Sequence, residues 1–112
     1  MDSQRRDELE RKLKESRDAW QHRLSAIQAD RRRQSDPLVS DSDDQAIQRE
    51  NDDTLDALDL QGRRELEAID AALERLSKGT AETCAQCGGT IESARLDARP
   101  WAASCIECAR AQ

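Results

Sequence analysis

Four cysteines, arranged as two closely spaced pairs, constrain this chain more than any other feature. They are all the cysteines of the 112-residue sequence, Cys84 with Cys87 and Cys105 with Cys108. Two C-x-x-C pairs separated by seventeen residues let four thiolates converge on one ion. Four sulfurs at about 2.3 Å from Zn²⁺ make a closed tetrahedral site with no open position for a substrate. The spacing therefore predicts one structural zinc ion bound by these four residues.

Two other uses of the cysteines are less consistent with the sequence. Disulfides would suit a secreted protein, but the N-terminal stretch MDSQRRDELERKLK has no apolar signal region. A thioredoxin-like redox pair would need a βαβ pattern nearby, and the sequence shows none. We therefore expect reduced cysteines in a cytoplasmic protein.

The composition excludes a conventional globular core. Aromatic residues make up 2 % of the chain and charged residues 38 %. With so few large apolar side chains, such a chain can be disordered, a long two-stranded coil or a small domain held by a metal, and its periodic apolar residues favour a coil combined with a metal site. The net charge of −6 argues against general nucleic-acid binding, and no apolar run is long enough to span a bilayer.

Apolar residues recur every three or four positions in two long stretches, which predicts two helices, over residues 3–33 and about 43–77. The spacing describes narrow seams, which suit one long partner helix. Ser3 is the expected cap of the first helix, and one of residues 40–42 caps the second. The segment 34–40 contains Asp36-Pro37 and is the expected turn. The seam positions are Leu9, Leu13, Trp20, Leu24 and Ile27 in the first helix, and Ile47, Leu55, Leu58, Leu66, Ile69, Leu73 and Leu76 in the second.

The fold class expected from this pattern is all-α: an antiparallel coiled-coil hairpin (1–78, with an acidic tip at 34–46) followed by a four-cysteine zinc module (79–112). If the turn centres near Leu38, facing residues have numbers that sum to about 77. Trp20 would then face residues 58–62, where Gly62 would leave room for the indole. Leu73 and Leu76, beyond the reach of most of the first helix, would pack on the zinc module.

The expected tip is strongly acidic. Between residues 36 and 59 there are nine acidic residues and one basic residue, Arg49. Clustered carboxylates at the end of a helix pair repel one another, so the tip is a functional candidate as well as a solvated surface.

The C-terminal third closely resembles the DksA/TraR family of bacterial transcription regulators. The resemblance lies in Cys84-Ala-Gln-Cys87-Gly-Gly-Thr-Ile, in Arg95-Leu-Asp-Ala-Arg99-Pro, and in Cys105-Ile-Glu-Cys108. The DksA-type tip motif D-x-x-D-x-A is matched by Asp41, Asp44 and Ala46.

This resemblance implies a regulator that binds RNA polymerase. The coiled coil would enter the secondary channel and bring Asp41, Asp44 and Ala46 near the active site, altering the stability of promoter complexes. Arg95 and Arg99 would contact the channel rim. Members that respond to ppGpp in the stringent response carry a basic residue directly after the fourth cysteine, where this chain has Ala109. Action with ppGpp and action without it, as in short TraR-like members, therefore both stay open.

Two alternatives come from other functional classes. One is a zinc-stapled coiled-coil adaptor that does not bind polymerase, and the other is a thiol redox sensor. An enzyme is not expected, because the single histidine, His22, lies on a charged helix and no catalytic set can be assembled around it. We expect a monomer without sequence-specific DNA binding.

Overall fold

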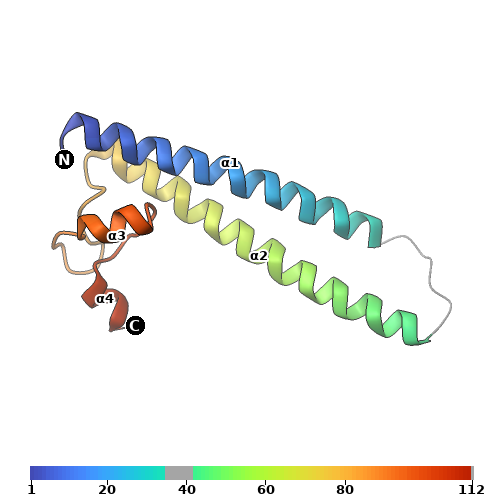
Figure 1. The fold of residues 1–112 in the computed structure, drawn as a ribbon. Helices are drawn as coiled ribbons and strands as arrows, with labels where there is room; N and C mark the ends of the chain where they lie inside the picture. Colours follow the sequence, from blue (N-terminus) through green and yellow to red (C-terminus); the bar gives the residue numbers. More distant parts are fainter. Residues whose placement is uncertain (35–41, 112) are drawn as a thin grey trace. The chain divides into compact units, whose positions relative to one another are not determined.

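The computed structural model describes residues 1–34 and 42–111, with side chains except at residues 34, 42–46 and 48. In this part of the chain, two long helices, α1 (Ser3–Gln34) and α2 (Ser42–Lys78), precede two short ones, α3 (Ser93–Ala98) and α4 (Ile106–Arg110) (Figure 1). The expected all-α class is confirmed, with a two-helix hairpin followed by a four-cysteine module. The expected turn lies almost entirely outside the described residues.

Helix α1 is capped one residue earlier than the sequence suggested. The backbone N–H of Arg5 donates to the Asp2 carboxylate at 2.8 Å. Asp2 is therefore the N-cap and Ser3 the first helical residue, because a carboxylate accepts an otherwise unpaired amide of the first turn. The expectation that Ser3 caps the helix was wrong.

Helix α2 ends just before a glycine. Gly79 has φ +79°, its N–H donates to the Leu76 carbonyl, and the N–H of Thr80 donates to the Arg75 carbonyl at 2.9 Å. These two bonds form a Schellman motif, in which a left-handed residue lets the chain turn back onto the last carbonyls of the helix.

The chain divides into two compact units, Met1–Asp18 with Glu67–Gln112, and Ala19–Leu66. Within each unit the segments of α1 and α2 run antiparallel (Figure 1). These units cut both long helices, whereas the expected division at residue 78 follows the boundary of the zinc module and stays a prediction.

The first unit contains most of the buried apolar residues. Leu13 and Ile69 are fully buried between the helices, and a second cluster lies in the zinc module around Ile91 and Leu96. Leu76 is buried and lines a hollow together with Met1 and Arg6. Ala81 and Glu82 of the zinc module line the same hollow, so Leu76 lies beside the first turn of α1 and beside the module, as expected.

In the second unit the helices pair in a different register from the one expected. Gln28 contacts Asp59, and Arg31 contacts Asp56, so the residue numbers of facing pairs sum to 87, not to about 77. Trp20 does lie at Gly62, but Leu24 comes closer: a Cβ on Gly62 would lie 3.2 Å from Leu24 Cδ1 and 3.8 Å from Trp20 Cε3.

The register also explains an exposed seam residue. Ile47 is 57 % exposed. With pairs that sum to 87, its partner position is residue 40, beyond the last residue of α1. The seam expected from periodicity thus extends further along α2 than α1 can cover.

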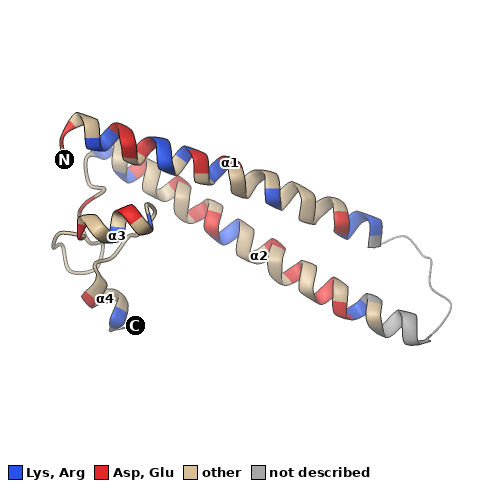
Figure 2. Cartoon of the chain, in the orientation of Figure 1, with Lys and Arg blue, Asp and Glu red and all other residues tan. Residues whose placement is uncertain are grey.

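Charged residues occur along both long helices, and acidic residues are frequent in the described part of α2 (Figure 2). Across residues 1–34 and 42–111, none of the helices combines the length and the apolar character needed for a membrane span.

Candidate metal centre and associated sites

The first cysteine pair lies in a tight turn held by backbone hydrogen bonds. Thr83 and Thr90 form an antiparallel bridge, and the N–H of Cys84 donates to the Gly89 carbonyl at 2.7 Å. Gly88 has φ +73°, a conformation that glycine adopts without steric cost. The turn directs the N–H of Gly89 to Sγ of Cys87, at 3.4 Å. The Cys-Gly-Gly sequence thus brings backbone amides to the cysteine sulfurs.

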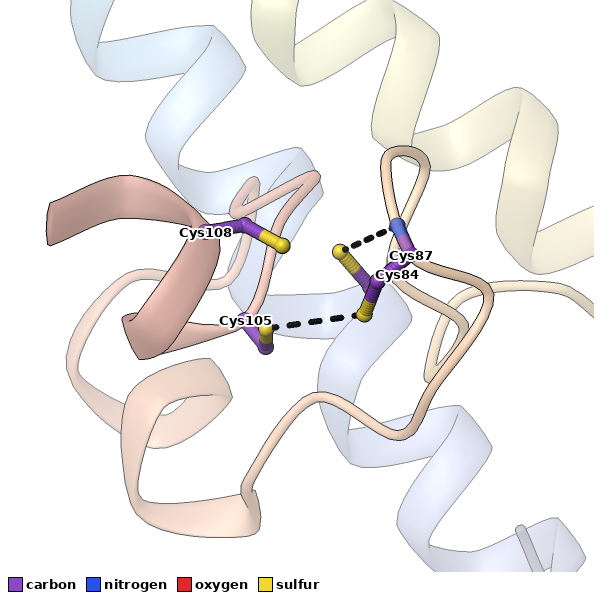
Figure 3. Close-up of side chains that lie close together, drawn as sticks. All are labelled: Cys84, Cys87, Cys105 and Cys108. Atoms are coloured by element: carbon purple, nitrogen blue, oxygen red, sulfur yellow. Dashed lines mark hydrogen bonds between the residues drawn. The ribbon is translucent and has the colours of Figure 1, made fainter. Parts of the chain in front are cut away.

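The second cysteine pair is held at the start of a short helix. Cys105 is the N-cap of α4, and its carbonyl accepts the N–H of Ala109 at 3.0 Å. Cys108 lies one turn further along α4, so its side chain is on the same side as Cys105. Figure 3 shows the four sulfurs of both pairs converging on one point.

The arrangement fits a zinc ion. The four Sγ atoms all lie within 4.8 Å of one another, and those of Cys87 and Cys105 are 3.8 Å apart. Sulfurs at 2.3 Å from a tetrahedral Zn²⁺ are themselves about 3.8 Å apart, whereas a disulfide requires about 2.05 Å. All four cysteines are free thiols, so the geometry favours a metal site over paired disulfides.

The thiols differ in their electrostatic surroundings. The backbone amides of Cys87 and Cys105 lower the pKa of Cys84 to about 6. Contacts with the thiols of Cys105, Cys84 and Cys87 raise the pKa of Cys108 to about 12. Four clustered sulfurs cannot all ionise against their mutual repulsion, and a bound divalent cation supplies the charge that keeps them as thiolates.

Arginine side chains connect segments of the zinc module by hydrogen bonds to backbone carbonyls. Arg95 Nε donates to the Ser104 carbonyl at 2.7 Å, which joins α3 to the residue before Cys105. Arg75, from the end of α2, donates to the Ala102 carbonyl at 3.3 Å. From α1, Arg5 and Lys12 form ion pairs with Asp97 at 3.7 and 3.8 Å.

The two arginines expected to contact a partner, Arg95 and Arg99, differ in solvent exposure. Arg95 is half-buried by its bond to Ser104, and Arg99 is exposed with its guanidinium 5.6 Å from the Trp101 ring centre. Both line an open hollow of about 360 Å³. The rest of its lining is formed by Glu92, Ala94, Ala98 and Ile106.

A buried carboxylate in the second unit was not anticipated from the sequence. Asp59 is 8 % exposed and is the one buried charged residue in the described part of the chain. Its hydrogen bond from Arg63 holds its pKa below the usual 3.8, and the nearby Gln28 and Arg31 act in the same direction. The sequence did carry a signal: positions 55, 59, 62, 66, 69, 73 and 76 follow one another by steps of four and three, which places Asp59 in the seam in preference to Leu58.

Two family models together cover most of the sequence. Residues 9–76 match the N-terminal domain of DnaK suppressor protein-like (DksA-like) proteins, and residues 79–112 match the prokaryotic dksA/traR C4-type zinc finger.

The chain belongs to the DksA/TraR family.

Solved structures of family members agree with this assignment. Transcription factor DksA2 from Pseudomonas aeruginosa is 32 % identical with a TM-score of 0.87, over 99 % of this chain and 84 % of that one. The DnaK suppressor protein from Agrobacterium tumefaciens C58 is 40 % identical with a TM-score of 0.64, over 95 % and 92 %. An uncharacterized protein of Aquifex aeolicus (strain VF5) is 48 % identical over 44 residues, which are 39 % of this chain and 30 % of that protein.

Family membership and geometry together assign the cofactor. The zinc-finger model spans all four cysteines, and their sulfurs form the one cluster of potential metal ligands found among the described residues. The module is a C4-type zinc finger with one structural zinc ion. When bound, that ion supplies cross-linking between the two cysteine pairs.

The residues expected at the tip are Asp41, Asp44 and Ala46. Asp41 lies outside the described residues. Asp44 and Ala46 fall in the first turns of α2, and their side chains are outside the described part of the structure. Their roles therefore stay predictions.

Proposed function

We propose that this DksA-type regulator acts by binding RNA polymerase, with the hairpin entering the secondary channel and the acidic tip altering the stability of promoter complexes. The observation that carries the proposal is the combination of both family models in one chain with the D-x-x-D-x-A sequence where α2 begins. Similarity to the transcription factor DksA2 over 99 % of this chain supports it.

Each part of the chain has a distinct role in this proposal. Asp41, Asp44 and Ala46 act at the tip, where carboxylates change the local field around catalytic metal ions of the polymerase. Arg95 and Arg99 contact the rim of the channel. The protein works by binding alone, as a cytoplasmic monomer, and contributes no catalytic group.

The charge of the distal hairpin supports an interaction with a basic surface. Acidic residues dominate the first half of α2 (Figure 2), and exposed Asp53 and Asp56 continue the acidic character beyond the motif. A basic channel lining attracts such a surface over about one Debye length, roughly 8 Å at physiological salt.

The decisive experiment is multi-round transcription in vitro with purified RNA polymerase and a ribosomal-type promoter, with and without ppGpp. We expect the native chain to change transcript yield and Asp41→Asn/Asp44→Asn to abolish that change while binding polymerase within a few-fold of the native affinity. The matched control, Asp52→Asn/Asp53→Asn, removes the same charge from α2 outside the motif; it should bind polymerase within the same few-fold and keep its effect on transcript yield.

Two results would count against the proposal. If Asp41→Asn/Asp44→Asn regulates as well as the native chain, the tip carries no activity. If the native chain shows no polymerase binding and sediments as a tight dimer, the adaptor alternative gains support. The arms with and without ppGpp decide whether the alarmone modulates this chain.

A further inference from the structure

A polar cluster joins the two helices in the second unit, where a coiled-coil seam is normally apolar. Asp59 Oδ2 lies 2.9 Å from Arg63 Nε and 3.3 Å from an Arg31 nitrogen, and Asp59 Oδ1 accepts from Gln28 at 3.5 Å. Arg31 also pairs with Asp56 at 2.7 Å. Arg31 therefore bridges two carboxylates of α2, one exposed and one buried.

A buried ion pair in a helix seam is weak evidence for stability, because desolvating the charges offsets their attraction. The better-attested role of a polar residue at such a position is to fix the register, at some cost in stability. Asp59 takes a seam position that leucine or isoleucine occupies elsewhere in α2, such as Leu55, Leu66 and Ile69. Its burial therefore calls for a reason other than packing.

The polar cluster is complete in one register of α1 against α2, and shifted registers can be compared with it. Helices can slip by one heptad or by eleven residues and still present the same faces to each other. A heptad slip toward the register expected from the turn would put Leu24 at the position of Arg31. A slip of eleven residues would put Trp20 there. In both cases an apolar side chain replaces the arginine between Asp56 and Asp59.

We propose that Asp59 and Arg31 form a register lock, which selects one pairing of α1 and α2 from several that the apolar pattern allows. The observed pairing is the one in which the buried carboxylate meets a cation from the opposite helix. In the slipped pairings Asp59 would keep Arg63 of its own helix but lose the cation that Arg31 supplies from α1, and breaking a buried ion pair is destabilising.

The register also sets how far α2 extends past α1. Arg31 is three residues from the end of α1, while its partner Asp56 is fourteen residues from the start of α2. The first turns of α2 thus continue past the end of α1. A heptad slip would move them by about 10 Å along the axis. If the proposed function holds, the lock positions Asp44 and Ala46 for the polymerase, but the lock itself is tested without polymerase.

The test uses nuclear Overhauser effects (NOEs) in the zinc-loaded, isotope-labelled full chain. In the native protein we expect one set of resonances and an NOE between a Leu24 methyl group and the Gly62 α-protons, because a Cβ added at Gly62 would lie 3.2 Å from Leu24 Cδ1, which places that methyl group near the Gly62 backbone. In Asp59→Leu and in Arg31→Leu/Asp59→Leu we expect the Leu24–Gly62 NOE to weaken. A second set of resonances should appear, with NOEs from Leu24 to residues near Asp56.

The double variant keeps the test decisive if a single variant unfolds, because it leaves no unpaired charge in the seam. Asp53→Leu is the matched control: it replaces an exposed aspartate of the same helix and should keep the native NOE and a single set. A double variant that is folded by circular dichroism and retains the full-intensity Leu24–Gly62 NOE in one set would overturn the proposal. The packing of Gly62 alone would then set the register.

Discussion

Replacement of Gly62 by alanine tests how tightly the two helices approach in the second unit. Glycine inside a helix costs about 0.8–1.0 kcal/mol relative to alanine, so Gly62→Ala gains about that much if the new methyl group fits. The added Cβ would lie 3.2 Å from Leu24 Cδ1 and no closer than 3.8 Å to the next atoms. Leu24 must therefore move by a few tenths of an ångström.

The sign depends on whether Leu24 can move. Its side chain is half-buried and the atom in contact is its terminal methyl group, so a small rotation relieves the contact at little cost. We expect Gly62→Ala to stabilise the protein by about 0.5–1 kcal/mol, a rise of about 2 to 6 °C in Tm for a domain of this size. Gly62→Leu should instead destabilise it by about 1–3 kcal/mol, as overpacking usually does.

Urea denaturation of the zinc-loaded protein measures the effect. In a Trp101→Phe background the fluorescence of Trp20 reports on the second unit alone, since Trp20 and Trp101 are the two tryptophans of the chain. A Gly62→Ala variant that loses 1 kcal/mol or more would refute the reasoning. It would show that the approach of the helices at Gly62 is rigid and that glycine is required there.

Three further predictions follow from burial, charge and the metal. Removal of zinc by a chelator, or Cys87→Ser, should broaden or shift the NMR resonances of residues 80–111, because the metal joins two short segments with little apolar filling; unchanged spectra would argue that the module folds without metal. Leu13→Ala, at a fully buried position, should cost about 2–5 kcal/mol, whereas Leu60→Ala, at a side chain 49 % exposed, should change stability by less than about 0.5 kcal/mol in urea titrations. The pKa of Asp59 is lowered in the folded state. Its contribution to stability is therefore present above its unfolded pKa of 3.8 and is lost as the pH falls through the folded value. Asp59→Asn should flatten the fall in stability between about pH 5 and pH 2, and an identical pH profile would contradict this.

Much of the local structure could be predicted because it depends on residues close together in the chain. The end of α2 at Gly79, the amide–sulfur contact of Gly89 and the short helix near residues 93–98 each follow from a few neighbouring residues. Errors at this level were small. Asp2 and Ser3 can each supply a capping oxygen. Asp2 caps α1 because its carboxylate reaches the Arg5 amide.

The pairing of the long helices could not be predicted in the same way. A turn centred near Leu38 implied facing numbers that sum to 77, but Gln28 and Asp59 show a sum of 87. Apolar periodicity repeats with each heptad, so several registers bury similar seams. A seam predicted through Leu58 misses Asp59, although the spacing of four and three residues passes through Asp59.

Residue spacing along the chain was enough to predict the four zinc ligands and the two long helices, because covalent geometry brings residues at such spacings together. The same cysteine spacing also pointed to the family. Which residues of α1 meet which residues of α2 is known from the folded protein alone, as are the bond of Arg95 to Ser104 and the exposure of Arg99. Those choices depend on the balance between burial and charge pairing across the two helices. A repeating apolar pattern is compatible with several registers of the two helices, whereas the buried Asp59 meets Arg31 in one of them.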